Sequence, residues 1–194
     1  EVLGLACKEL EFYTFKTIAL PEETLIVSRT GYTGEDGFEI YGSHAYICAA
    51  WDKLQESGRA KACGLGCRDT LRFEVGLPLY GDELSEEISP IMAGLGMFVK
   101  LDKADFIGKE AVAAQKANGV SRKLIGIELE ARAIPRHGYE VVDAEGNTIG
   151  EVTTGYCSIS TGKSVCMALV DVAHAALGTA VGIIHRVAQQ AKHL

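Results

Sequence analysis

The chain has 194 residues, of which 47% are hydrophobic and 23% charged, and its net charge is −7. This length is enough for one medium domain or two small ones with a sizeable core. The acidic balance argues against a nucleic-acid-binding protein, because phosphate contacts need a basic surface. No apolar run approaches the roughly 20 residues of a membrane-spanning helix, which argues against a membrane protein.

The first predicted elements are two strands and a glycine-rich hairpin. Residues 10–29 alternate between apolar and polar side chains around a turn at Leu20–Glu23, which predicts a pair of strands. The next segment, Arg29–Tyr41, reads RTGYTGEDGFEIY. Its three glycines let the backbone turn sharply where other residues would clash.

Glu39 lies near the end of this segment, on a short predicted strand. Its apolar neighbours Phe38 and Ile40 are expected to face a core, so that Glu39 and Tyr41 face the other way. A carboxylate that a strand fixes directly after a glycine-rich turn is well placed to accept hydrogen bonds from a ligand. The alternative is an ordinary hairpin with a solvated glutamate.

A helix is predicted after Ser43, a favourable N-cap residue, and it stops at Gly58. Its apolar side chains recur at helical spacing and form a stripe that we expect to pack in the core. The stripe consists of Tyr46, Ile47, Ala50, Trp51 and Leu54.

The segment Gly64–Gly81, which reads GLGCRDTLRFEVGLPLYG, predicts a tight turn followed by a short helix. Asp69 is expected in the first helical turn, where a negative side chain suits the helix dipole. Gly76 is expected to close the helix, and Pro78 prevents it from resuming.

A third helix is predicted from Asp105, as its N-cap, to Asn118, and ends at Gly119. After Arg122 the helical pattern gives way to short apolar or alternating runs. These runs are Leu124–Leu129, Tyr139–Val142, Thr148–Val152 and Val165–Val170, with a hairpin loop at Asp143–Asn147.

Several short strands without an intervening helix predict a small β-barrel or sandwich. We therefore expect an α+β chain with a domain boundary near Gly119–Ser121. The first domain would comprise residues 1–119 and the second, an all-β barrel-like domain, residues 120–194.

The six cysteines are expected to be reduced thiols buried in the core. A chain of this size and apolar content does not need disulfides. Cys63 and Cys67 lie close together in the sequence, but no second Cys or His pair has the spacing of a metal site, so we expect no metal. Cys48 and Cys166 have apolar neighbours, as small buried side chains do.

Together, Arg29–Tyr41 and Gly64–Gly81 closely resemble the aminomethyltransferase family, the T-protein of the glycine cleavage system. Further matching stretches are SPIMAGLG (89–96), DFIGKEA (105–111), RHGYEV (136–141) and GEVTTGYCSISTGKSVCMALV (150–170). The resemblance covers nearly the whole chain. It implies that residues 1–119 are the C-terminal part of the family's folate-binding region and that residues 120–194 are its C-terminal barrel.

The resemblance also implies a reaction. T-proteins are similar three-domain molecules with tetrahydrofolate in a central hole. They take the aminomethyl group from the lipoyl arm of the H-protein, release ammonia and leave the one-carbon unit on tetrahydrofolate as the 5,10-methylene form. The implied substrate is tetrahydrofolate, the implied partner is lipoylated H-protein, and the implied location is the bacterial cytoplasm or the mitochondrial matrix.

Carried over residue by residue, the family's pterin-binding glutamate falls on Glu39 and its buried arginine near the folate on Arg68. Its folate-lining tyrosines fall on Tyr32 and Tyr80. One edge of a pterin presents adjacent N–H and NH2 donors, which a carboxylate accepts in a bidentate way. Tyrosines supply flat walls with a polar tip. The alternative for Arg68 is an ion pair that holds the turn at Gly66 against the hairpin.

Two features of the family cannot be placed. The catalytic aspartate belongs to an N-terminal half that precedes anything in this chain. We therefore expect a fragment, or one part of an enzyme whose remaining half is a separate polypeptide, and we expect this chain alone to be inactive. The C-terminal arginine near the glutamate tail of folate has no counterpart that we can identify in Ile184–Leu194.

Three other functions stay open. One is a folate-dependent demethylase, or the folate-binding part of a dimethylglycine or sarcosine oxidase, which shares the glycine-rich turn. Another is a non-catalytic folate-binding protein linked to iron–sulfur assembly, whose motif Lys-Gly-Cys-Tyr-x-Gly-Gln-Glu is absent from the sequence. The last is a docking or structural module without activity.

Overall fold

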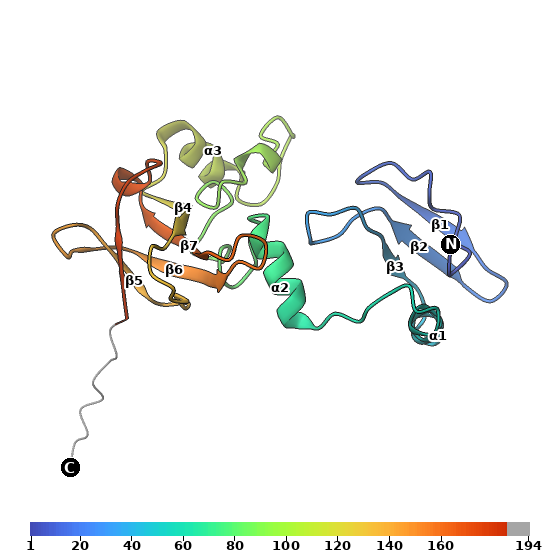
Figure 1. The fold of residues 1–194 in the computed structure, drawn as a ribbon. Helices are drawn as coiled ribbons and strands as arrows, with labels where there is room; N and C mark the ends of the chain where they lie inside the picture. The colour runs from blue at the N-terminus through green and yellow to red at the C-terminus, as the bar shows by residue number, and fades with distance from the viewer. Residues whose placement is uncertain (186–194) are drawn as a thin grey trace, which may run out of the picture. The chain divides into compact units, whose positions relative to one another are not determined.

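The structure is a computed structural model that describes residues 1–185 (Figure 1). The chain divides into two compact units, the first from Glu1 to Leu77 and the second from Pro78 onward. Each unit has its own sheet. The domain boundary near Gly119–Ser121 stays a prediction: a helix ends there, but the second compact unit already begins at Pro78.

The first unit contains an antiparallel sheet in the order β1-β2-β3. Its strands are β1 (Phe15–Ala19), β2 (Thr24–Ser28) and β3 (Glu39–Tyr41). The backbone N–H of Leu20 donates to the Glu23 carbonyl at 2.8 Å and closes the predicted turn. Leu25 and Val27 are fully buried while Ile26 between them is exposed, as in a sheet with one covered face. The predicted strand pair is confirmed.

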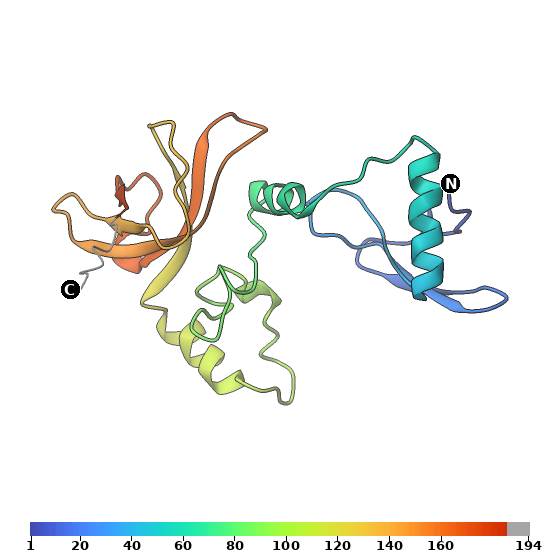
Figure 2. The ribbon, with the colours of Figure 1, turned by 90° about the horizontal axis from the view of Figure 1, so that it is seen from below.

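Helix α1 (His44–Glu56) covers the buried face of this sheet (Figure 2). Ser43 is its N-cap, as predicted, and its hydroxyl accepts a first-turn N–H at 3.2 Å. Ala50 of the predicted stripe is buried, but Ile47 and Trp51 are exposed. The expectation that the whole stripe packs in a core is therefore wrong, because a three-stranded sheet covers only part of the helix's apolar face.

Helix α2 (Leu65–Glu74) ends in a Schellman motif. Gly76, in the left-handed conformation with φ of +70°, donates its N–H to the Phe73 carbonyl at 2.9 Å. The N–H of Leu77 reaches back to the Arg72 carbonyl at 3.0 Å. The predicted closure of the helix by Gly76 is confirmed.

The predicted place of Asp69 is wrong by a small margin. The helix begins at Leu65, and no acidic residue lies in its first turn. Asp69 instead accepts a hydrogen bond from the Arg72 Nε at 2.6 Å, one helical turn further along. Its carboxylate is thus used for an ion pair within the helix and not for the helix dipole.

In the second unit, helix α3 (Lys109–Asn118) starts later than predicted. Gly108 precedes it with φ of +84°, a left-handed conformation that separates the helix from Asp105. Asp105 is therefore not its N-cap. The predicted end at Gly119 is confirmed. Two short 3-10 helices, η1 (Gly96–Phe98) and η2 (Val172–His174), complete the helical elements of residues 78–185.

The second unit is built on an antiparallel sheet in the order β4-β7-β6-β5-β8. Its strands are β4 (Arg122–Glu128), β5 (Glu140–Val142), β6 (Thr148–Cys157), β7 (Ser164–Asp171) and β8 (Gly182–Ile184). The predicted strands and the Asp143–Asn147 loop are present. Strand β6 is longer than predicted, and β8 was not predicted. The buried core cluster of this sheet is Val141, Ile149, Val152, Cys166, Ala168 and Val170.

All six cysteines are free thiols. Cys166 is buried in the core of the second unit, and burial raises its pKa to about 12. The prediction of burial is wrong for Cys48, Cys63 and Cys67, which are exposed. Apolar neighbours in the sequence do not protect Cys48, because adjacent helical residues point about 100° apart around the axis. None of the helices in residues 1–185 is long and apolar enough to cross a membrane.

Candidate functional site

Glu39 is held at the start of β3 by a chain of hydroxyl groups. It is half-buried and pairs in register with Ser28 of the neighbouring strand. The hydroxyl of Thr30 donates to the Glu39 Oε2, and the Thr30 and Ser28 hydroxyl oxygens lie 2.8 Å apart. Since Thr30 uses its proton for the carboxylate, Ser28 donates to Thr30. Among residues 1–185, Oε1 of Glu39 has no such partner.

An ion pair closes the glycine-rich loop that leads to Glu39. The Arg29 Nε lies 2.9 Å from the Asp36 Oδ1, and Nη2 donates to Oδ2 at 3.1 Å. Nη1 donates to the Leu10 carbonyl at 2.7 Å. The hydrogen bonds from Arg29 hold the pKa of Asp36 below its ordinary value. The two ends of the loop are thus fastened to each other.

The same loop packs against the end of α2. Gly34 has φ of +75°, and a Cβ atom added there would lie 2.6 Å from the Val75 Cγ1. Glycine alone satisfies both the left-handed backbone and this close approach. The loop and the C-terminal end of α2 are therefore held together within the first unit.

Tyr32 and Arg68 are brought into contact. The guanidinium carbon of Arg68 lies 5.2 Å from the centre of the Tyr32 ring, which is a cation–π distance. Arg68 is exposed in the first turn of α2, and Tyr32 is half-buried in the loop. Arg68 forms no ion pair with any residue from 1 to 185. This cation–π contact joins the first turn of α2 to the glycine-rich segment. The alternative interpretation of Arg68 expects an ion pair in this structural role.

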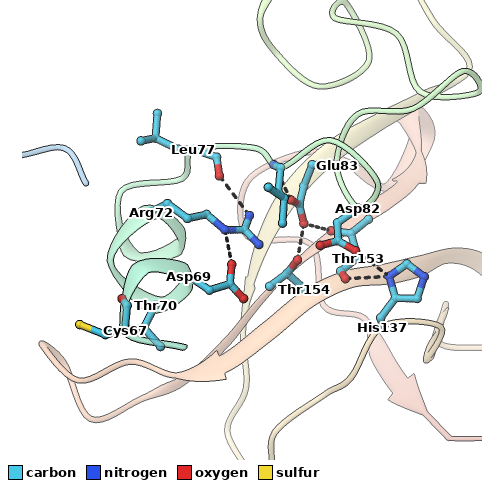
Figure 3. Close-up of polar contacts among 11 residues, drawn as sticks. Cys67, Asp69, Thr70, Arg72, Leu77, Asp82, Glu83, His137, Thr153 and Thr154 are labelled. Atoms are coloured by element: carbon cyan, nitrogen blue, oxygen red, sulfur yellow. Dashed lines mark hydrogen bonds and ion pairs between the residues drawn. The ribbon is translucent and has the colours of Figure 1, made fainter. Parts of the chain in front are cut away.

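Tyr80 belongs to the second unit, in a tight turn at Leu79–Leu84. Its side chain is 71% exposed. The N–H of Gly81 donates to the Leu84 carbonyl at 2.7 Å and that of Glu83 to the Leu79 carbonyl at 2.9 Å. Figure 3 shows the side chains of Asp82 and Glu83, which belong to this turn. The structure thus brings Tyr32 and Arg68 together, places Glu39 in the same unit, and carries Tyr80 on the other unit.

A cavity of about 460 Å³ in the first unit lies on the other face of β3. Val27, Ile40 and Leu54 contribute to its apolar lining. Because Glu39 and Ile40 are adjacent on a strand, they point to opposite faces. None of the predicted site residues lines this cavity, so the predicted site is a separate, polar surface of the sheet and loop.

No cluster of three or more His, Cys, Asp or Glu side chains that could hold a metal is present in residues 1–185. Cys63 and Cys67 are neighbours at the start of α2, and the hydrogen bond between them is the main cause that raises the pKa of Cys67. The segment predicted to lack the family's C-terminal arginine lies, from residue 186 onward, outside the described residues.

Sequence reasoning missed the residues that hold Glu39 in place. Ser28 and Thr30 are two positions apart, so on a strand they lie on one face. A hairpin register that pairs Ser28 with Glu39 would have placed all three side chains together. The spacing of Ser28 and Thr30 could therefore be read from the sequence. Their contact with Glu39 could not, because it depends on the strand register, which the glycine-rich loop between the two strands leaves undetermined.

Residues 2–103 match the family model described as the GCVT N-terminal domain, and residues 122–192 match that of the glycine cleavage T-protein C-terminal barrel domain. The chain is 50% identical over 182 residues to an aminomethyltransferase of Caldanaerobacter subterraneus subsp. tengcongensis, which covers 92% of this chain and 48% of that protein. It is 54% identical over 188 residues to an aminomethyltransferase of Bacillus mycoides, covering 94% and 51%.

The structure is also similar to a crystal structure of the glycine cleavage system aminomethyltransferase T from Bartonella henselae. The TM-score is 0.88 at 36% sequence identity, and the match covers 95% of this chain and 52% of that chain. The chain spans about half the length of the curated relatives that it matches.

Proposed function

Because the chain belongs to the glycine cleavage T-protein family of aminomethyltransferases, we propose that it is the C-terminal part of such an enzyme and supplies residues that bind tetrahydrofolate. The reaction moves the one-carbon unit of an aminomethyl group to tetrahydrofolate, which becomes the 5,10-methylene form, and releases ammonia. Tetrahydrofolate is a substrate in this reaction.

The arrangement of Glu39 is the observation that carries the proposal. A pterin edge offers two adjacent donors, and a carboxylate with its plane fixed accepts both. The hydroxyls of Thr30 and Ser28 fix Oε2 of Glu39, and each carboxylate oxygen retains acceptor capacity for a ligand. A rigid strand and a fastened loop hold the group in place before any ligand binds, which lowers the entropic cost of binding.

Tyr32 and Arg68 have complementary roles in this proposal. The Tyr32 ring provides a flat wall for the pterin, and its contact with the Arg68 guanidinium fixes the orientation of that wall. The exposed guanidinium also retains donors for a ring carbonyl or a carboxylate of the substrate. Tyr80, to which the resemblance also assigns a folate contact, is proposed as a further aromatic residue for the substrate.

The partner in this proposal is a lipoylated H-protein, which presents the aminomethyl group on its lipoyl arm. No residue of the chain is assigned to that contact. Location in the bacterial cytoplasm or the mitochondrial matrix stays a prediction. The relatives from Caldanaerobacter subterraneus and Bacillus mycoides both carry the name aminomethyltransferase, which supports this activity over a demethylase or a non-catalytic folate-binding protein.

The test is Glu39→Gln in an enzyme of full family length that carries residues 1–194. The amide keeps the shape of the side chain but turns one acceptor into a donor that opposes the pterin. Tetrahydrofolate binding should weaken by about 1.5–3 kcal/mol, the range for hydrogen bonds to charged groups, as measured by calorimetry.

Glu35→Gln is the matched control, because Glu35 is an exposed carboxylate in the same loop. It removes the same charge four residues away and should leave the affinity nearly unchanged. Equal affinity of Glu39→Gln and the unmodified enzyme would remove Glu39 from the folate site. Equal losses in both variants would mean that the loop's charge, and not a specific contact, is responsible.

A further inference from the structure

The second unit contains a completely buried carboxylate, that of Glu83, which the proposed site does not use (Figure 3). Its Oε1 accepts hydrogen bonds from the hydroxyls of Thr153 and Thr154 at 2.7 and 2.6 Å. Its Oε2 accepts the backbone N–H of Leu79 at 2.9 Å. Burial of a charged group is costly unless hydrogen bonds compensate for lost water, so each of these contacts matters.

A β-bulge in β6 explains how two consecutive threonines reach one oxygen atom. Val152 pairs with Ala168, and Thr154 pairs with Met167, so that Thr153 is an extra residue in the ladder. In a regular strand Thr153 and Thr154 would point to opposite faces. The bulge turns both hydroxyls toward Glu83.

A second contact joins the turn to the bulge. His137 Nδ1 lies 2.9 Å from the Thr153 carbonyl, and since a carbonyl only accepts, this nitrogen carries the proton. The same nitrogen lies 3.6 Å from the Asp82 Oδ1. Asp82 therefore approaches the bulged part of β6 through His137, and Glu83 bonds to it directly. These contacts join residues about 55 to 70 positions apart in the sequence.

The turn that Glu83 fastens is the one that presents Tyr80. Glu83 bonds through its side chain and its own N–H to the two backbone groups of Leu79, the residue before Tyr80. Gly81, the residue after Tyr80, is bonded to the Leu84 carbonyl. The backbone on both sides of Tyr80 is thus fixed, while its side chain is exposed.

We propose that Glu83 is a positioning residue: its buried carboxylate attaches the Leu79–Leu84 turn to the bulge of β6 and thereby sets the place of the Tyr80 ring for the substrate. This inference rests on the proposed function, in which Tyr80 contacts the folate. A role in the stability of the second unit alone is the competing explanation, and it would not act through Tyr80.

The first measurement is amide hydrogen exchange of the 194-residue chain. Glu83→Leu keeps a similar volume but removes all acceptors, and exchange at Leu79 and Gly81 should become at least about tenfold faster, the effect of one lost hydrogen bond to a carboxylate. Glu83→Gln keeps an acceptor for Leu79, and its amide can donate to the threonine hydroxyls, so most protection should return. Glu86→Gln, an exposed carboxylate nearby, is the control.

If Glu83→Leu does not fold, Thr154→Val removes one of the hydroxyl donors without a change in volume and should accelerate the same amides. Unchanged exchange at Leu79 in a folded Glu83→Leu or Thr154→Val variant would overturn the attachment of the turn.

The second measurement is a double-mutant cycle on tetrahydrofolate affinity in an enzyme of full family length. Tyr80→Ala and Glu83→Leu should each weaken binding several-fold, up to about tenfold, the range for an aromatic contact. The double variant should be no weaker than Tyr80→Ala alone, because Glu83 acts through Tyr80. Glu83→Leu and Glu39→Gln should instead be additive.

The affinity measurements separate failure of the proposed function from failure of the positioning role of Glu83. Full affinity in Tyr80→Ala and in Glu39→Gln contradicts the proposed function. A loss in Tyr80→Ala with full affinity in Glu83→Leu, or with additive effects of the two changes, contradicts the positioning role and leaves the folate site in place.

Discussion

The two units of the chain differ in how their buried apolar side chains are grouped. In the first unit the sheet buries Leu25 and Val27, yet large apolar side chains stay exposed around it. These include Phe12, Tyr13, Phe15, Trp51 and Leu65. In the second unit, the strands β4–β7 enclose a continuous core around Val152 and Cys166. The second unit also exposes large apolar side chains, such as Ile107 and Leu177, but these lie outside its strands. The difference is therefore that the five-stranded sheet gathers a cluster of buried apolar residues, whereas the three-stranded sheet buries few.

The polar contacts of the two units differ in the same way. In the first unit, Ser28, Thr30 and Glu39 lie within one hairpin, and Arg29 reaches Asp36 across one loop. In the second unit, Glu83 bonds to Thr153 and Thr154, about 70 positions away. The candidate folate contacts are thus built from local geometry, whereas the anchor of the Tyr80 turn depends on the completed fold.

The largest effect is expected when the 194-residue chain alone is assayed for aminomethyl transfer. We expect no activity, because positioning of the folate against the reacting carbon supplies several kcal/mol of the barrier. By the family resemblance, the aspartate that positions the folate amine is not among these residues. The measurement is ammonia release from aminomethyl-loaded H-protein with tetrahydrofolate.

A full-length relative, such as the Bacillus mycoides aminomethyltransferase, serves as the positive control in this assay. Turnover by the 194-residue chain comparable to that control would contradict the prediction. It would also show that the exposed apolar surface of the first unit does not prevent the site from working.

The next largest effect is expected for Gly34→Ala. The left-handed backbone and a Cβ atom 2.6 Å from Val75 should together destabilise the first unit by about 2–4 kcal/mol. Trp51, the single tryptophan of the chain, lies in this unit, so its fluorescence reports the unfolding of the first unit.

Gly31→Ala is the matched control for this substitution. It adds the same atom in the same loop, but no atom lies within 4 Å of the new position and no positive φ is involved. It should be close to neutral. Similar losses in both variants would mean that the contact between the loop and α2 does not stabilise the unit, and the fixed placement of Glu39 would lose its support.

Much of the fold could be predicted from local signals. The turn at Leu20–Glu23, the cap at Ser43, the helix ends at Gly76 and Gly119, and most strands of the second unit were predicted from residue type and spacing. The predicted fold class, α+β with a C-terminal barrel, is confirmed by the family and structural matches. The family resemblance itself is also confirmed, and it rested on two glycine-rich segments.

The errors share a physical cause, which is that burial and register depend on distant neighbours. The exposure of Trp51 and Cys48 depends on what covers α1, and sequence periodicity does not report this. The bulge at Thr153 shifts side chains between faces and gives no signal in residue type. The contacts of Glu83 with Thr153 and Thr154 could therefore not be predicted.

Alkaline pH is expected to destabilise the second unit, because its core contains the buried thiol of Cys166. The Cys166 thiol has a pKa of about 12 in the folded chain, against 9.0 ordinarily. Between these values the unfolded chain releases the proton and the folded chain retains it, so the free energy of unfolding falls as pH rises. The slope should be at most about 1.4 kcal/mol per pH unit.

Cys166→Ala provides the comparison for this prediction. The variant should be less stable at every pH because of the cavity, but it should lack this part of the slope. Denaturant unfolding of the second unit, followed by circular dichroism from pH 8 to 11, measures the difference. Parallel curves for the two proteins would mean that the buried thiol does not control the alkaline loss of stability.

The smallest effect on stability is expected for Arg68→Ala. An exposed cation–π contact is worth about 0.5–1 kcal/mol, so the melting temperature of the first unit should change little. If the guanidinium binds the substrate or orients Tyr32 for it, turnover of an enzyme of full family length should fall far more than stability does. Arg59→Ala, which removes an exposed arginine paired with Glu1 in the same unit, should affect neither. A sharp drop in melting temperature, with normal turnover per folded molecule, would instead make Arg68 a structural residue that joins α2 to the glycine-rich loop.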